Sequence, residues 1–433
     1  MNDVYSVSPK VVAVGQDANI VVTGLRSRAF IPGEIYNVQV SSMTNHPDHT
    51  QFKTIALPPK DKSLVSEPSR GGVIEFKQSF ATKGEYSIFV TRNDESATYV
   101  TAERIYAAAP ELSRLRPYKG DLHIHTYYSD GRMSPIYMAV TGRKLGLDFA
   151  AITDHGRYWP SLEAIEMAKK IDLDLLLFPG EEVSFPEGHI ISICAAACVS
   201  GLRKNEDAYK NELREIAETC LQDTVMVENL EKDQYAPAKW TVDKIHALGG
   251  YAFLAHPHWI SRNRYHLNLP IFEQLLEDDD IDGLEVIGGY PPWDLESNLL
   301  TITKYYTEVG KGRKIPILGN SDTHFRSTVD IYGWYWTTVF AESLCKKDIF
   351  DAILNLKSVA CERPNDERLV ACGPFDLVEY TCFLEREFFP LHDRICKMEG
   401  ELYMDILMGK EVSLDQLDKL KKSLADLYSA SWQ

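Results

Sequence analysis

Apolar, strand-like runs alternate with helix-like stretches along most of the chain after residue 120. The strand-like runs include GLDFAAIT, DLLLFPG, GHIISICAA, GYAFLAH, DGLEVIG and KIPILGN. The helix-like stretch SPIYMAVTGRKLG opens with Ser134 as a candidate N-cap and Pro135 at the first helical position. Such alternation indicates parallel strands with helical crossovers. About seven repeats favour a distorted (β/α)7 barrel, similar to a TIM barrel, over an open sheet.

Histidines and carboxylates gather where these strands are predicted to end. In Asp121-Leu122-His123-Ile124-His125 the two imidazoles share one strand face, because side chains alternate with period two. Barrel strands deliver their carboxyl ends to one face, so separate clusters converge there. Imidazole and carboxylate together suit divalent transition metals, and the convergence predicts a metal site. The other clusters are Ser129-Asp130-Gly131, Thr153-Asp154-His155, Gly180-Glu181-Glu182, Gly188-His189, Ala255-His256-Pro257-His258 and Asn320-Ser321-Asp322-Thr323-His324.

Two of these clusters, Gly180-Glu181-Glu182 and Gly188-His189, differ from the others. Glu181 and Glu182 are adjacent, and strand alternation lets only one of them point inward. The G-x-E spacing selects Glu182. His189 opens its predicted strand, whereas the other clusters end theirs, so His189 fits the convergence least well.

The remaining parts of the chain have other patterns. Residues 1–112 carry short alternating runs separated by turn formers, which predict an antiparallel, immunoglobulin-like β-sandwich with a loop at residues 57–72. We expect the barrel over residues 116–356 and a charged C-terminal helical section over 357–433. In that section Leu414, Leu417, Leu420 and Leu424 recur at helical spacing, as in a packing stripe.

Composition excludes several classes of protein. The chain has 46 Lys and Arg against 63 Asp and Glu, a net charge of −17, which argues against binding to nucleic acid or anionic membranes by bulk charge. No apolar run approaches the roughly 20 residues of a membrane-spanning helix. The start MNDVYSVSPK is not a signal peptide, so we expect a cytoplasmic protein. The 8 cysteines form no CxxC pair and are expected to be inert, and His46 and His49 are expected in a solvated turn.

The pattern HxH…SDG…TDH…GxE…GH…HP…SDxH resembles the PHP superfamily, named for polymerase and histidinol phosphatase. The segments GDLHIHTYYSDG and GNSDTHF…GWYWTTVFAE are most similar to its carbaryl-hydrolase branch (CehA/McbA-like). The resemblance covers residues 116–356. It does not extend to the predicted sandwich or to the C-terminal section.

The resemblance implies a site for two or three divalent ions, zinc, manganese or iron. Asp130 stands where several relatives have histidine, which favours manganese or iron at the third position. Glu182, His256 and Asp322 would carry catalysis, with a hydroxide bridging the first two metals as nucleophile. His123, His125, Glu182 and Asp322 would hold the first metal, Glu182, His189 and His256 the second, and Asp130, His155 and His324 the third.

Other side chains are candidates for orienting ligands or for touching substrate. Asp154 adjoins His155 and either orients a ligand or caps a helix. Glu285, at another predicted strand end, is expected to orient a ligand or a bound water. His258 and Trp259 follow His256 on one loop and are expected to contact substrate.

Arginines are the expected contacts of a phosphate group. Many phosphoesterases of the superfamily carry arginine directly after the His-Pro pair, whereas this chain has HPHW. One of Arg157, Arg262 and Arg264 would then bind the phosphate. His266 is either a surface residue or part of the pocket rim.

Three functions remain open at this point. One is a phosphoesterase for a small phosphorylated molecule, the activity that the superfamily implies. Another is a carboxylester, carbamate or amide hydrolase, which the closer branch implies, because one metal centre serves both reactions. The third is a non-enzymatic protein in which metals stabilise the barrel and the sandwich binds a protein or glycan partner.

Overall fold

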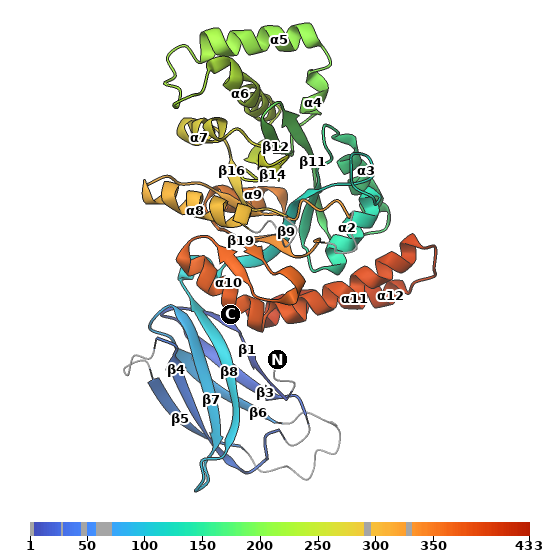
Figure 1. Ribbon diagram of the computed structural model, residues 1–433. Coiled ribbons are helices and arrows are strands. Elements are labelled where there is room, and N and C mark those ends of the chain that lie inside the picture. The colour runs from blue at the N-terminus through green and yellow to red at the C-terminus, as the bar shows by residue number, and fades with distance from the viewer. Residues whose placement is uncertain (1–3, 27–28, 45–49, 58–71, 290–295, 326–330) are drawn as a thin grey trace. The chain divides into compact units, whose positions relative to one another are not determined.

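The computed structural model describes residues 4–26, 29–44, 50–57, 72–289, 296–325 and 331–433 (Figure 1). His46, His49 and most of the predicted loop at 57–72 lie outside these ranges. The chain divides into two compact units. No helix in the described ranges is long and apolar enough to cross a membrane. One unit comprises Met1–Arg116, Glu379–Ile395 and Asp418–Gln433, and the other Pro117–Val378 and Cys396–Leu417.

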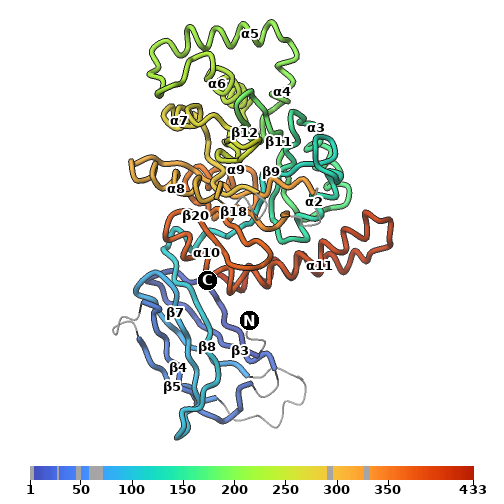
Figure 2. The backbone as a smooth tube through the Cα atoms, in the orientation of Figure 1, coloured from blue at the N-terminus to red at the C-terminus, as the bar shows by residue number. Residues whose placement is uncertain are grey.

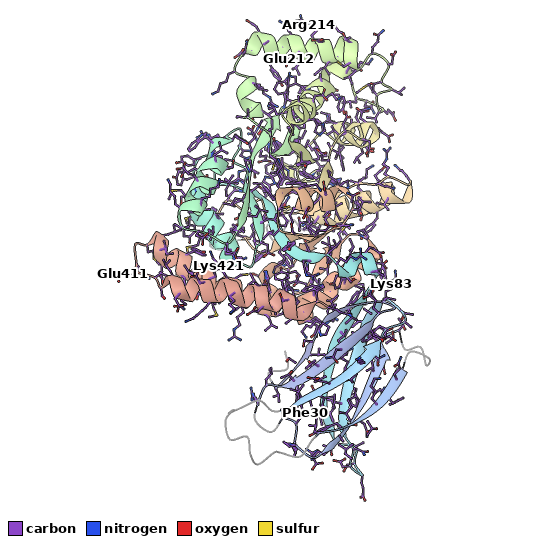
Figure 3. The ribbon with its side chains drawn as sticks, turned by 180° about the vertical axis from the view of Figure 1, so that it is seen from behind. Phe30, Lys83, Glu212, Arg214, Glu411 and Lys421 are labelled. Carbon is purple, nitrogen blue, oxygen red and sulfur yellow. The ribbon has the colours of Figure 1, made fainter. Side chains whose placement is uncertain are left out.

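The first unit contains two facing β-sheets. Residues along β3 and β4 are alternately buried and more exposed, as period-two sequence patterns require. The buried side chains of both sheets form one core, which includes Phe30, labelled in Figure 3. An immunoglobulin-like connection of the strands stays a prediction. One sheet has the order β1 (Tyr5–Ser8), β3 (Asp17–Gly24), β6 (Val73–Ser79), and the other β2 (Val11–Ala13), β8 (Tyr99–Ala108), β7 (Gly84–Arg92), β4 (Ile35–Ser42), β5 (Thr50–Ala56).

A ten-stranded sheet forms the frame of the second unit. The pairs β9/β10, β10/β11, β13/β16 and β16/β17 are parallel, as the alternation of strands and helices predicts. The order across the sheet is β17 (Ile317–Gly319), β16 (Gly283–Ile287), β13 (Tyr251–Leu254), β12 (Gly188–Ile193), β11 (Leu176–Phe185), β10 (Phe149–Ile152), β9 (Arg116–Ile124), β18 (Tyr335–Ala341), β19 (Ser358–Glu362) and β20 (Val370–Cys372).

This sheet curls, but it is not a uniform repeat of strand and helix. β12 is antiparallel to both of its neighbours, and β18, β19 and β20 form an antiparallel run. The hydroxyl of Ser358 donates to the carbonyl of Ile317 and that of Thr337 to the carbonyl of Gly319, each at 2.8 Å. These bonds bring β17 beside β18 and β19. The result is a mixed α/β unit with a barrel-like sheet, and the regular (β/α)7 arrangement stays a prediction.

Helices connect the strands of the second unit (Figure 2). The predicted start of α2 is confirmed, since Ser134 Oγ accepts a hydrogen bond from the backbone N–H of Tyr137 and Pro135 is the first helical residue. The helices are α2 (Pro135–Lys144), α3 (Trp159–Lys170), α4 (Val199–Leu202), α5 (Glu206–Glu215), α6 (Lys232–Ala247), α7 (Leu269–Asp278), α8 (Glu296–Gly310) and α9 (Lys346–Leu354).

The C-terminal section is helical, as predicted. It consists of α10 (Phe375–Glu387), α11 (Phe389–Leu407) and α12 (Leu414–Ser431), whose parts are shared between the two units. Leu417, Leu420 and Leu424 are buried, as in a packing stripe. The prediction for Leu414 was wrong, because this residue begins α12 and its side chain is 71% exposed.

Candidate metal centre

The strand ends bring most of the predicted ligands together. His125 directly follows β9, His155 lies just beyond β10, and Asp322 and His324 lie just beyond β17. Parallel strands place these ends at one edge of the sheet. Three groups have ligand atoms within 4.8 Å of one another and could hold a metal ion: His123, His125, Glu182 and Asp322; His125, Asp130, His155 and His324; and His155, Glu182 and His189.

The direction of β12 explains why His189 joins these groups. β12 is antiparallel to β11, with His189 opposite Ser184. The start of β12 therefore lies at the carboxyl end of β11, where the other ligands gather. Parallel strands throughout were expected, so His189 fitted the predicted convergence least well, and the reversal of β12 removes this difficulty.

The inner group consists of His123, His125, Glu182 and Asp322. Nε2 of His123 lies 3.3 Å from Glu182 Oε2 and 3.2 Å from Asp322 Oδ1, and Nε2 of His125 lies 3.2 and 3.0 Å from the same two oxygens. The two imidazoles and Glu182 are fully buried, while the side chain of Asp322 is 22% exposed. Four ligand atoms thus surround one point at the floor of the site.

The inner atoms fit a metal ion better than they fit one another. His123 Nε2, His125 Nε2, Glu182 Oε2 and Asp322 Oδ1 are all buried without a hydrogen bond of acceptable geometry. Buried polar atoms are rarely left so. Metal–ligand distances of about 2.0–2.2 Å place neighbouring ligand atoms about 2.9–3.5 Å apart, the spacing found here. The four inner atoms therefore have the spacing and the burial expected of ligands to a divalent ion.

His256 approaches the same glutamate from another side. Glu182 Oε1 lies 2.7 Å from His189 Nδ1 and 3.1 Å from His256 Nε2, and these two nitrogens are 3.4 Å apart. Oε1 of Glu182 thus faces this pair while Oε2 faces the inner group. This arrangement suits the bridging role that the resemblance implies for Glu182.

The outer group consists of Asp130, His155 and His324. Asp130 Oδ1 lies 3.2 Å from His324 Nε2, and Asp130 Oδ2 lies 3.8 Å from His155 Nε2. Their side chains are 34%, 30% and 21% exposed, in the order Asp130, His155, His324. His155 also turns its Nδ1 to Glu182 Oε2 at 2.9 Å, a contact that the sequence did not suggest.

Charge is strongly coupled across the metal-free cluster. Burial would raise the pKa of Glu182, but the imidazoles of His189 and His123 hold it well below its ordinary value. Burial would lower the pKa of His125, but the facing carboxylates of Asp322 and Glu182 raise it to about 10. Without metal the acids are ionised and this imidazole is protonated, so a cation takes the place of protons.

A buried polar network fixes the inner imidazoles. His123 Nδ1 lies 3.2 Å from Glu285 Oε1, which also accepts from Asn320 Nδ2 at 2.9 Å, and Glu285 Oε2 accepts from the backbone of His256 at 2.8 Å. Such a carboxylate orients a ligating imidazole. Asp121, for which no role was expected, also belongs to this network, since its Oδ1 accepts from the backbone N–H groups of His123 and Ser321. Strand alternation puts residues 121, 123 and 125 on one face, and this pattern could have identified Asp121 as a neighbour of the two histidines.

Asp154 holds the loop that carries Asp130. Its carboxylate accepts from the backbone and hydroxyl of Thr126 at 2.8 and 2.6 Å, and from the backbone and hydroxyl of Ser129. Asp154 thus holds Thr126 and Ser129, which precede Asp130 in this loop. Gly131 completes this loop, because a Cβ there would lie 2.8 Å from the carbonyl carbon and oxygen of His125.

Two predicted ligands have strained backbones. His256 has a φ of 28° and Asp322 a φ of 48°, in the region that side chains disfavour. Strain of this kind persists where the surrounding structure imposes it, and it clusters at functional sites.

Glu181 points away from the cluster, as alternation predicts. Its carboxylate accepts from the backbone of Val199 and the thiol of Cys198 at the start of α4. This carboxylate caps a helix, while the next one along β11 faces five imidazoles.

The predicted substrate contacts divide into two kinds. The ring of Trp259 lies 5.4 Å from that of His256. His258 instead packs against Tyr265 and Phe272, and its Nδ1 lies 2.8 Å from the hydroxyl of Thr301. The position of the His258 ring therefore does not support the predicted contact with substrate.

The three predicted phosphate-binding arginines are exposed. Within the described part of the chain, the side chains of Arg157, Arg262 and Arg264 make no hydrogen bond or ion pair to the cluster. Their role in binding substrate stays a prediction.

Several known proteins are similar to parts of this chain. An uncharacterized protein of Methanocaldococcus jannaschii is 27% identical over 186 residues, covering 40% of this chain and 82% of that protein. A crystal structure of a Bacteroides vulgatus two-domain protein, described as containing a predicted PHP-like metal-dependent phosphoesterase, has a TM-score of 0.43 and 20% identity. That similarity covers 63% of this chain and 70% of the other.

A shorter match involves a DNA polymerase/3′-5′ exonuclease, PolX, of Bacillus subtilis. It is 38% identical over 73 residues, which are 16% of this chain and 13% of the polymerase. The chain thus spans a small part of that relative's length. No family model matches the sequence.

Proposed function

We propose that this protein is a metal-dependent hydrolase and that its substrate is a small phosphoester. One observation carries the proposal: four buried ligand atoms face one point without hydrogen-bond geometry. Next to them the outer group is open to solvent. A buried floor and an open rim are what a hydrolytic site needs to hold ions and admit substrate.

Each part of the cluster has a role in this proposal. The inner group would hold one divalent ion, Glu182 with His189 and His256 a second, and Asp130 with His155 and His324 a third. Bound divalent ions would supply positive charge for an anionic substrate and activate water. Glu285 holds His123 with its Nε2 toward the inner site. Asp154 keeps Asp130 at the rim.

A carboxylester, carbamate or amide hydrolase is the second candidate. It is favoured by the exposed positions of the three candidate arginines, Arg157, Arg262 and Arg264. Phosphate recognition commonly uses such a cation. The carbaryl-hydrolase branch, which the motifs resemble, belongs to this alternative.

A substrate panel separates the two candidates. Metal-loaded protein is assayed on aryl phosphates and on matched aryl esters and carbamates. We expect turnover of phosphates that disappears in Asp322→Asn, with unchanged circular dichroism as evidence of folding. Turnover of esters or carbamates alone would contradict the phosphoesterase proposal and support the alternative.

Metal analysis addresses the non-enzymatic alternative. We expect at least two equivalents of metal per chain and loss of activity on chelation. Less than one equivalent, with unaltered thermal stability after chelation, would contradict a metal-dependent enzyme.

A further inference from the structure

A short hairpin follows the strand end that carries His256. β14 (Ile260–Ser261) and β15 (Arg264–Tyr265) pair antiparallel, and Arg262 and Asn263 between them have φ values of 52° and 64°. Two left-handed residues make the tight turn that hairpins of this length use. The backbone N–H of His266 donates to the carbonyl of Trp259 at 2.8 Å. The hairpin therefore fixes Trp259 and His266 side by side.

Both rings lie against imidazoles of the cluster. The ring centroid of His266 is 4.5 Å from that of His189, and that of Trp259 is 5.4 Å from that of His256. The centroids of Trp259 and His266 are 5.0 Å apart, with their planes tilted by 53°. The two rings thus form one aromatic surface beside the Glu182, His189 and His256 side of the site.

This surface has polar atoms without a hydrogen-bond partner among the described residues. Trp259 and His266 are partly exposed. Within the described residues, neither the Trp259 Nε1–H nor a ring nitrogen of His266 has a hydrogen-bond partner. Tryptophan and histidine in packed positions usually satisfy these groups, as His258 does with Thr301. Flat, partly exposed rings with free polar atoms suit a ligand that is itself flat and polar at its edge.

We propose that Trp259 and His266 form the wall of a subsite for a planar ring carried by the substrate. The ring would stack on the indole, and its polar edge would bond to the His266 imidazole. This inference rests on the proposed hydrolase function and narrows its substrates to esters of ring-bearing alcohols or acids. Unbranched alkyl esters would lack this contact.

Equilibrium binding of compounds that are not hydrolysed tests whether Trp259 and His266 contact a ring. The probes are phenylphosphonate and methylphosphonate, titrated into metal-loaded protein by calorimetry. We expect phenylphosphonate to bind about tenfold more tightly, since stacking adds to the burial of its ring. Trp259→Ala and His266→Ala should bring the ratio of the two dissociation constants close to one. Trp259→Phe should restore most of the preference.

Phe375→Ala is the matched control, because Phe375 is an aromatic residue that is 77% exposed in the same unit of the chain. It should leave the ratio unchanged. Metal content is measured for every variant, so that loss of an ion is not mistaken for loss of the ring contact. An unchanged ratio in Trp259→Ala, at full metal content, would overturn the proposal.

Steady-state kinetics separate this inference from the proposed function. The same phenyl-to-methyl comparison is made for kcat/KM with phosphates and with carboxylic esters. If only carboxylic esters turn over, the phosphoesterase proposal fails. The aromatic subsite is then tested by the ratio of kcat/KM for phenyl and methyl carboxylic esters. In the active series we expect Trp259→Ala to raise KM for the phenyl substrate more than it lowers kcat. An equal effect on both substrates would contradict the wall.

Discussion

The inner and outer ligand groups share the same chemistry but differ in how the protein holds them. His123, on β9, and His125, directly after it, are fully buried, and Glu285 and Asp121 fix His123. Asp130 is 34% exposed and belongs to a loop that depends on Asp154. Burial on a strand gives rigid ligands and excludes competing water. A loop at the rim gives ligands that can adapt to substrate. We infer that the inner group holds its ion more tightly than the outer group.

The largest effect should come from Glu182, which connects the groups. Glu182→Gln removes the charge that faces five imidazoles, and we expect loss of metal and a fall in kcat of about 10³-fold or more. Glu181→Gln is the matched control, since it changes the adjacent carboxylate on the opposite strand face. It should lower stability and leave metal content intact. Equal losses of metal in the two variants would contradict the assignment.

Glu285 tests whether the buried network distinguishes the inner group. Glu285→Gln weakens the bond that orients His123, and we expect inner-site metal affinity to fall by about 10–100-fold. Metal competition with a chromophoric chelator measures this change. Glu308→Gln, a buried change on α8 beside Lys304, should leave that affinity unaltered. An unaffected affinity in Glu285→Gln would show that the inner imidazoles need no such support.

Asp154 tests the outer group. Asp154→Ala removes the acceptor of Thr126 and Ser129, so we expect a loss of about 1–3 kcal/mol in unfolding free energy. The loop should then release the outer ion, with a fall in kcat of about tenfold, while the inner ions remain. Metal analysis beside denaturation curves checks both effects. Loss of all metal in this variant would remove the distinction between the two groups.

The last prediction concerns the stability of the metal-free protein and its pH dependence, not activity. His125 has a pKa raised to about 10, so its contribution to stability is fully present below about pH 6.5 and is lost as pH rises through 10. We expect the unfolding free energy of metal-free protein to fall over this window, by up to about 1.4 kcal/mol per pH unit. Denaturant titrations between pH 6 and 10 measure it. A rise over this window would contradict a protonated imidazole in the cluster.

The sequence predicted the chemistry of the site better than its architecture. Strand alternation, a local rule that the structure obeys, required one of Glu181 and Glu182 to point inward, and the G-x-E spacing selected Glu182. The prediction that the histidine and carboxylate clusters lie together needed only the rule that parallel strands end at the same edge of a sheet. His189 could not be placed in this way, because the reversal of β12 is set by pairing with distant strands.

Long-range packing also limited the remaining predictions. His258 follows His256 closely in sequence, but its ring lies between Tyr265 and Phe272. The hydrogen bond between Asn320 and Glu285 joins two strands, and neither local sequence contains a signal for it. The pairing of His266 with Trp259 depends on a turn at Arg262 and Asn263, residues without the glycine that usually marks such a hairpin.

Anomalous X-ray diffraction from crystals of the metal-loaded protein tests the central claim most directly. We predict a strong peak among His123, His125, Glu182 and Asp322, about 2.0–2.2 Å from the ligand atoms of each. We predict a weaker peak beside Asp130 at the rim. Loaded crystals with no anomalous density among the four inner residues would contradict the account.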